Sequence, residues 1–151
     1  MKLHLAFVDN ETLHADIILN FAGRQWLCDS YYFALDRHLL PECEDAAKIG
    51  MALRRLLEQW HAALKKTRVA EAVFLPYDFS DQYTGWLRCT RTDDGFVIVR
   101  GWSGVEGWSL SPSNIGNLLY RLESFHADGP TVEMSAGELF DAIDRSLSLT
   151  A

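Results

Sequence analysis

Residues 71–112 constrain the fold more than any other stretch of this chain, because they combine many aromatic side chains with charges that are mostly confined to turns. Within them, segments 86–91 and 96–102 are rich in aromatic and β-branched residues, and the turn between them ends in Asp94-Gly95. An Asp-Gly pair between two such segments favours a hairpin, since glycine accepts the positive φ that the turn requires. The sequence therefore predicts a β-hairpin at the centre of the fold.

Segment 42–66 has the clearest helical pattern in the sequence. Its apolar residues recur every three or four positions and form one stripe, made of Ile49, Leu53, Leu56, Trp60 and Leu64. Pro41 precedes the segment, acidic residues occupy its first turns, and Lys65 and Lys66 close it, which matches the helix dipole at both ends. Such a helix must bury its stripe, and the aromatic strands that follow are the expected partner.

Shorter elements complete the prediction. Strands are expected at 3–8, 16–21, the first half of 25–35 (whose spacing also suits a helix), 72–75, a short stretch around Trp108, and an edge at 131–134. Residues 76–84 are expected to form a loop. Ser111-Pro112 is typical of a helix start and predicts a helix that runs to residue 125. Ser135 and Glu138 form a capping-box pattern in front of a last helix.

Clustered strands without regular alternation of strand and helix favour the α+β class. We therefore expect one globular domain spanning 1–151, with a mainly antiparallel sheet packed against the long helix at about 42–66 and two shorter C-terminal helices. A chain of 151 residues is long enough to bury a full core.

The charge of the chain bears on its partners. A net charge of −7 without any cluster of Lys and Arg argues against nonspecific binding to DNA, RNA or anionic lipid, and favours a partner with a basic surface. No segment approaches the apolar length of a membrane span, and no signal peptide is recognised. The three cysteines show no CxxC spacing, which is typical of free thiols in a reducing compartment. We expect a cytoplasmic protein whose oligomeric state the sequence leaves open.

No motif dictates a reaction or a cofactor. The histidines lack the spacings that place two imidazoles on one metal, and they are His4, His14, His38, His61 and His126. Cys89 falls in mid-strand without a local nucleophile signature, and the glycine-rich stretch 101–107 lacks the lysine of a phosphate-binding loop. We therefore expect no metal site and no cofactor.

Carboxylates and tryptophans are the remaining candidates. Asp78 and Asp81 fall in an aromatic loop, where two carboxylates can serve as general acid and base or hold a cation, or can simply cap turns through their own backbone. Asp93, Asp94 and Glu106 are expected in nearby turns. Trp102 and Trp108 flank the glycine-rich stretch, where they either anchor an interface or cover the sheet.

Segments 75–86, 101–103 and 107–113, with sequences LPYDFSDQYTGW, GWS and GWSLSPS, resemble a small bacterial domain type. Acidic proteins of this kind are similar to immunity proteins that neutralise polymorphic toxins. The resemblance covers about the middle third of the chain and transfers no catalytic residue. It implies a bacterial cytosolic binding protein.

Three functions remain in competition. The first is a macromolecule-binding protein, possibly an immunity-type inhibitor of a toxin, with a face made of Asp78, Asp81, Tyr83, Trp86, Asp93, Asp94, Trp102, Glu106 and Trp108. The second is a small hydrolase-type enzyme that uses Asp78 and Asp81 in a cleft beside Tyr83 and Trp86. The third is a structural subunit of a homo-oligomer, which requires an apolar patch on the hairpin edge.

Overall fold

The computed structural model describes residues 3–8, 16–42 and 45–150, so His14 and Cys43 lie outside the described residues. The first strands form an antiparallel three-stranded sheet in the order β1 (Leu3–Phe7), β2 (Ile17–Phe21), β3 (Arg24–Cys28). A four-stranded antiparallel sheet follows in the order β4 (Ala72–Phe79), β5 (Thr84–Arg91), β6 (Gly95–Ser103), β7 (Phe125–Ser135). The helices are α1 (Tyr31–Ala34), α2 (Ala46–Lys66) and α3 (Ala136–Ser148), with short 3-10 turns η1 (Gly107–Ser109) and η2 (Gly116–Leu119).

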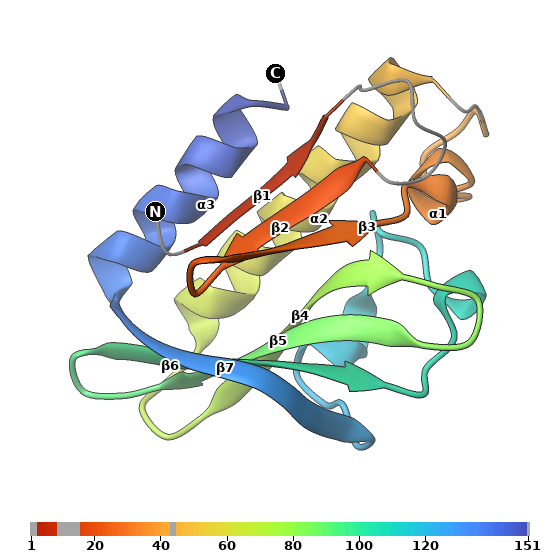
Figure 1. The fold of residues 1–151 in the computed structure, drawn as a ribbon. Coiled ribbons are helices and arrows are strands. Elements are labelled where there is room, and N and C mark those ends of the chain that lie inside the picture. Colours follow the sequence, from red (N-terminus) through yellow and green to blue (C-terminus); the bar gives the residue numbers. More distant parts are fainter. Residues whose placement is uncertain (1–2, 9–15, 43–44, 151) are drawn as a thin grey trace.

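The α+β class is confirmed, while the expected arrangement of a single sheet is corrected (Figure 1). β1, β2 and β3 pair with one another as an antiparallel meander. The chain then continues into α1 and α2 before β4 starts the second sheet. The predicted hairpin is confirmed, since β5 and β6 pair from Thr84–Ser103 to Arg91–Phe96. This hairpin lies between β4 and β7, so the free edges of the sheet belong to β4 and β7 and not to the hairpin.

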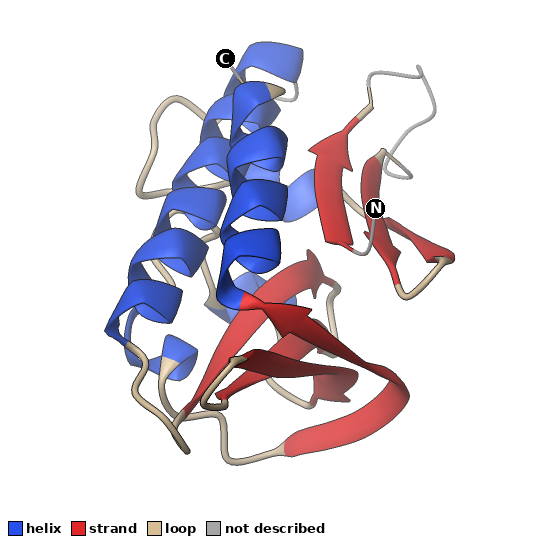
Figure 2. Ribbon diagram, turned by 90° about the vertical axis from the view of Figure 1, so that its left-hand side faces the viewer, coloured by secondary structure: helices blue, strands red, loops and turns tan. Residues whose placement is uncertain are grey.

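The long helix α2 begins later than expected. Asp45 is its N-cap, and the Asp45 side chain accepts a hydrogen bond from the Lys48 backbone N–H at 2.8 Å, so Pro41 lies outside the helix. The predicted apolar stripe is buried throughout. It contacts α1, α3, β1 and β4 rather than the hairpin alone. Figure 2 shows α2 and α3 side by side, with the strands on the other side of the molecule.

The helix expected at 111–125 is wrong. This stretch contains one 3-10 turn, η2, because tertiary hydrogen bonds take the backbone groups that a helix would use. Ser113 donates from its backbone N–H to the Asp36 carboxylate at 2.7 Å, and Ile115 donates to the Gln59 side chain at 2.8 Å. Gly116 has φ +71°, a left-handed conformation that ends a right-handed helical path.

Strands β4 and β7 both exceed their predicted lengths. β4 continues to Phe79 through the first four residues of the expected loop 76–84, and β7 spans Phe125–Ser135 through a sequence that suggested a helix stop. Pro130 is accommodated because β7 is an edge strand, where a missing N–H costs no ladder hydrogen bond on the outer side. The capping box is confirmed, since Ser135 and Glu138 exchange backbone hydrogen bonds of 3.1 Å each.

One hydrophobic cluster includes side chains of both sheets and all three α-helices. Trp60 donates from its indole to the Pro76 carbonyl at 3.1 Å, and Trp86 donates to the Thr84 hydroxyl at 2.6 Å. Trp86 is 0% exposed, so it stabilises the core and does not belong to the expected partner-binding face. No helix of the described residues is long and apolar enough to cross a membrane.

Candidate binding surface and pocket

Two irregularities in the four-stranded sheet occur at the same end of it. The register between β4 and β5 shifts between Pro76 and Asp78, and the register between β6 and β7 shifts between Val99 and Gly101. On β7, residues 128–130 stand opposite the single residue Arg100. Such bulges re-aim side chains and are frequent beside functional sites. Both of them lie at the pocket described next.

A pocket of about 360 Å³ opens on this end of the sheet, and we call it the polar pocket. Its lining comes from four adjacent strands and one turn, and consists of Asp78, Tyr83, Gly85, Arg100, Gly101, Trp102 and Asp128. Gly85 pairs with Trp102 and Leu87 pairs with Arg100, so these side chains share one face of the sheet. A Cβ at Gly85 would lie 3.1 Å from the Tyr77 hydroxyl and 3.0 Å from the Asp78 Cβ, so the glycine allows both side chains to pack closely against β5.

Arg100 is the cation of the polar pocket. Its guanidinium stacks 4.4 Å from the Trp26 ring and donates from one terminal nitrogen to the Asp128 carbonyl at 3.1 Å. The buried Tyr77 hydroxyl lies beside Arg100. Burial raises the pKa of Tyr77, and the charge of Arg100 and a side-chain hydrogen bond with it oppose that rise. The two polar groups therefore interact with each other inside the fold.

Asp78 is the carboxyl of the pocket whose pKa is shifted. Burial and the nearby charge of Asp29 raise the pKa of Asp78 from 3.8 to about 6, against the opposing effects of Arg100 and a hydrogen bond with Ser80. Burial also raises the pKa of the neighbouring Cys28 thiol, which makes a thiolate nucleophile unfavourable there. The pocket therefore combines a fixed cation with a carboxyl that titrates near neutral pH.

Three large aromatic side chains are exposed around the polar pocket. Tyr83 is 44% exposed, Trp102 is 40% exposed and Trp108 is 62% exposed. Trp102 stacks on His126 with ring centroids 4.5 Å apart, and Trp108 donates from its indole to the Glu106 carboxylate at 2.7 Å. These contacts hold both indoles in fixed orientations although water reaches them.

The segments that carry these aromatic residues are fastened to one another. Gly107 donates to the Ser80 carbonyl at 2.7 Å, and the Thr84 hydroxyl donates to the Val105 carbonyl at 2.9 Å. A Cβ at Gly107 would lie 2.4 Å from the Ser80 carbonyl oxygen, so this close approach requires glycine. The turn 80–83 and the stretch 104–110 therefore form one surface at the ends of β4, β5 and β6 (Figure 1).

Most of the predicted face is brought together and part of it is not. Tyr83, Trp102 and Trp108 gather with the two carboxylates Asp81 and Glu106, and we call these five residues the aromatic end. Asp78 lies beside it in the polar pocket. The predicted residues Asp93 and Asp94 stand in the turn at the opposite end of the hairpin, roughly 25 Å away along the eight residues of β5. They belong to a different surface.

The expected pair of catalytic carboxylates is separated. Asp78 lines the polar pocket, while Asp81 accepts a hydrogen bond from the Tyr32 hydroxyl and does not line it. The hydrogen bond to Asp81 raises the pKa of Tyr32 to about 12. Among the described residues, no three His, Cys, Asp or Glu side chains are grouped as a metal site would require.

Sequence reasoning missed Arg100, Tyr77, Gly85 and Asp128. Arg100 is an isolated basic residue in a predicted strand, and Asp128 fell in a predicted helix stop. A glycine inside an aromatic strand such as Gly85 was the available clue, since it indicates a bulge or a close approach.

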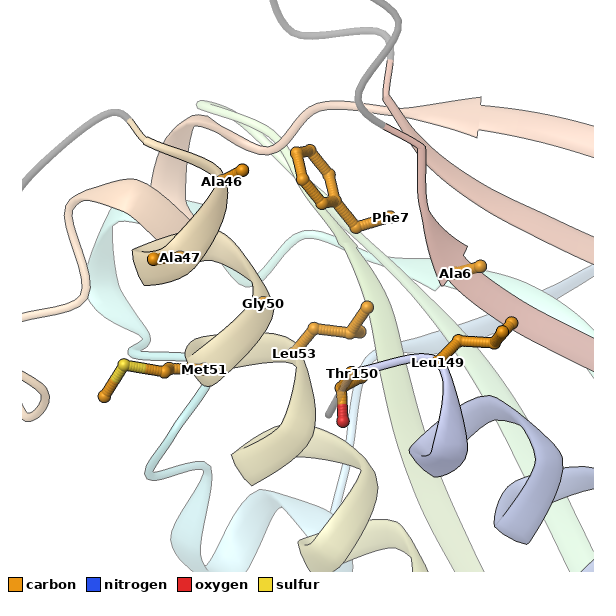
Figure 3. Close-up of a pocket in the computed structure, with 9 residues that line it drawn as sticks. All are labelled: Ala6, Phe7, Ala46, Ala47, Gly50, Met51, Leu53, Leu149 and Thr150. Carbon is orange, nitrogen blue, oxygen red and sulfur yellow. The ribbon is translucent and has the colours of Figure 1, made fainter.

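A second, larger pocket of about 460 Å³ lies where β1, α2 and the end of α3 meet (Figure 3). We call it the apolar pocket, and its lining is Ala6, Phe7, Ala46, Ala47, Gly50, Met51, Leu53, Leu149 and Thr150. Its one side-chain hydroxyl, on Thr150, donates to the Leu147 carbonyl at 2.7 Å. This pocket offers no charged group to a ligand.

Comparison with known proteins identifies no relative, since no family model, no curated protein and no solved structure matches this chain.

Proposed function

We propose that this protein binds another protein through the aromatic end, and that the partner presents a basic surface. The observation that carries the proposal is the exposure of Tyr83, Trp102 and Trp108 on segments that are hydrogen-bonded to one another. Large aromatic side chains dominate the binding energy of many protein interfaces, and exposing several of them together is unfavourable unless a partner covers them.

Charge supports the choice of partner. Asp81 and Glu106 lie among the aromatic residues, and the chain carries a net charge of −7. Complementary potentials accelerate encounter with a basic protein, whereas the phosphates of a nucleic acid would be repelled. The indole of Trp108 is already oriented by Glu106, so little side-chain entropy is lost when it docks.

An immunity-type role is the specific form of this proposal. A small acidic protein that covers a basic toxin domain in the bacterial cytoplasm needs exposed anchors, negative charge and no catalytic machinery of its own. The aromatic end supplies the anchors and the charge.

The test is affinity capture of the tagged protein from its native cells, read by mass spectrometry. The face variant combines Trp108→Ala, Asp81→Lys and Glu106→Lys, and the matched control combines Asp93→Lys and Asp94→Lys at the far end of the same hairpin. Both variants change the net charge by the same amount. We expect a stoichiometric protein with wild type and control that is absent with the face variant.

If the face variant captures the partner as well as wild type does, or if the control loses the partner as the face variant does, the aromatic end is not the binding surface. Capture of the same chain as its own main partner, with dimers in sedimentation, would support the homo-oligomer instead.

A second candidate, a small hydrolase-type enzyme, is favoured by the raised pKa of Asp78 alone. A general acid needs a pKa near the working pH, and Asp78 lies in a pocket beside Arg100. The expected result is turnover of a chromogenic ester, glycoside or phosphate substrate that falls at least about tenfold in Asp78→Asn. Turnover that is equal in wild type and variant, or absent in both, would contradict it.

A further inference from the structure

We propose that the polar pocket binds a free α-amino acid, with the ligand carboxylate held by Arg100 and its ammonium held by Asp78. This inference goes beyond the protein partner proposed above, because it assigns a small-molecule site to residues outside the aromatic end, with Tyr83 and Trp102 shared as walls.

The acceptor requirement comes from Arg100, the cation that lines the pocket. One of its terminal nitrogens donates to the Asp128 carbonyl, and a guanidinium carries five N–H donors in all. A guanidinium matches a carboxylate with two parallel hydrogen bonds. The stack on Trp26 fixes the plane of the Arg100 guanidinium before any ligand arrives.

The donor requirement comes from the carboxylates on the other side of Gly85. Asp78 and Asp128 line the same pocket as Arg100, and the Cβ of Asp78 lies 3.0 Å from the position of a Cβ at Gly85. A simple anion would meet these carboxylates and be repelled, and a simple cation would meet Arg100. A zwitterion satisfies both signs at once, since its carboxylate and its ammonium sit on neighbouring atoms.

The shape of the pocket agrees with a ligand of this size. A volume of about 360 Å³ is at the lower end of the range for small-molecule sites. Trp102 forms one wall, and its stack on His126 presents a fixed apolar surface to the ligand side chain.

The titration of Asp78 gives the proposal a pH signature. The groups that face Asp78 are Asp29 and Cys28 from the region of β3, Arg100 from β6, and Ser80 from the turn after β4. An ammonium binds the ionised carboxylate, so affinity rises as the pH rises through about 6, the pKa of Asp78. An anionic ligand would show the opposite dependence.

The experiment is isothermal titration calorimetry with three matched probes, namely phenylalanine, 3-phenylpropionate without the ammonium, and phenethylamine without the carboxylate. We expect phenylalanine to bind at pH 7.5 and to bind more weakly at pH 5, with each truncated probe weaker by about tenfold or more. Equal affinity for all three probes, or no heat with any of them, would overturn the proposal.

Variants locate the site. Asp78→Asn is expected to remove the pH dependence, and Gly85→Ala is expected to weaken phenylalanine binding by about tenfold because its methyl group would press on Asp78 and Tyr77 and displace the Asp78 side chain. Gly137→Ala is the matched control, since a Cβ there meets nothing within 4 Å. Circular dichroism and urea unfolding verify that each variant folds. A folded Gly85→Ala variant with wild-type affinity would contradict the assignment.

The two proposals fail separately. The face variant that removes Trp108, Asp81 and Glu106 changes no residue that lines the polar pocket, so it is expected to bind phenylalanine as wild type does. Loss of amino-acid binding in that variant would contradict the separation of the two sites.

Discussion

The apolar and polar pockets differ in size and in chemistry. Size favours the apolar pocket as a ligand site, whereas chemistry favours the polar pocket. The apolar pocket is the larger, about 460 Å³ against about 360 Å³, yet its walls are aliphatic, aromatic and backbone surfaces (Figure 3). The polar pocket combines a guanidinium with two carboxylates and lies at two bulges of one sheet. Selectivity for a ligand requires placed polar groups, so the smaller pocket is the better candidate.

The comparison also concerns stability. Leu53 and Ala6 in the apolar pocket belong to the hydrophobic core, so their packing holds the fold together. Asp78 in the polar pocket is a buried carboxyl whose pKa is raised by burial and by Asp29, and Arg100 opposes that rise. We therefore expect substitutions in the apolar pocket to change stability, and substitutions in the polar pocket to change binding.

The largest effect is expected from Leu53→Ala. Leu53 is 1% exposed, and a buried Leu→Ala change costs about 2–5 kcal/mol in the free energy of unfolding. Urea unfolding followed by circular dichroism measures this loss. Phenylalanine affinity should stay unchanged in the folded variant, and a parallel loss of affinity would erase the contrast between the pockets.

Asp78→Asn is expected to stabilise the protein above pH 6. The pKa of Asp78 is raised from 3.8 to about 6 in the fold, so the stability of the wild type falls as the pH rises through this window. The difference corresponds to a limit of about 3 kcal/mol. Unfolding curves at pH 4, 5, 6 and 7.5 should converge at pH 4 and favour the variant above pH 6. A difference in unfolding free energy between variant and wild type that is the same at every pH would show that folding does not raise the pKa of Asp78.

Arg100→Met is expected to lower the free energy of unfolding above pH 6 by about 1–2 kcal/mol, because methionine keeps the apolar stem but removes the hydrogen bond to the Asp128 carbonyl and the positive charge beside Asp78. Phenylalanine binding should disappear. The pKa of Asp78 should rise above about 6, since Arg100 lowers it in the wild type. Carboxyl-carbon NMR of the variant measures this pKa, and an unchanged value would show that the two groups do not interact.

The smallest effect on stability is expected from Trp108→Ala. Trp108 is 62% exposed, so its removal should change the free energy of unfolding by about 0.5 kcal/mol or less. Thermal unfolding detects this. A decrease of several kcal/mol in the free energy of unfolding would mean that Trp108 stabilises the fold instead of serving as an exposed binding residue.

Local sequence signals predicted the elements whose cause is local. The β5–β6 hairpin, the stripe of α2 and the Ser135–Glu138 capping box follow from short segments, and all three are confirmed. The reason given for Gly95 is corrected: its φ is not positive, and glycine is required there because a Cβ would lie 2.1 Å from the Met134 carbonyl oxygen of β7. Residues 111–125 were predicted wrongly as a helix because two of their backbone N–H groups donate to Asp36 and Gln59, which lie far away in the sequence. Periodicity alone does not contain that information.

The candidate site depends even more on distant pairings. Arg100 and Asp128 meet because β7 bulges opposite β6, and the aromatic spacing of Trp86 does not reveal that it faces the core. The exposed positions of Tyr83, Trp102 and Trp108 follow from how two turns are fastened together. The sequence thus predicted a face of aromatic and acidic residues, and the structure places Trp86 in the core and Asp93 and Asp94 at the opposite end of the hairpin.

The contrast between the pockets is tested most directly by two-dimensional ¹H–¹⁵N NMR during a phenylalanine titration. The account predicts saturable shifts of the Trp102 indole and of the backbone amides of Gly85, Arg100 and Gly101, with Gly50 and Leu53 of the apolar pocket unmoved. Shifts confined to Gly50, Leu53 and their neighbours, or no saturable shift anywhere, would contradict it.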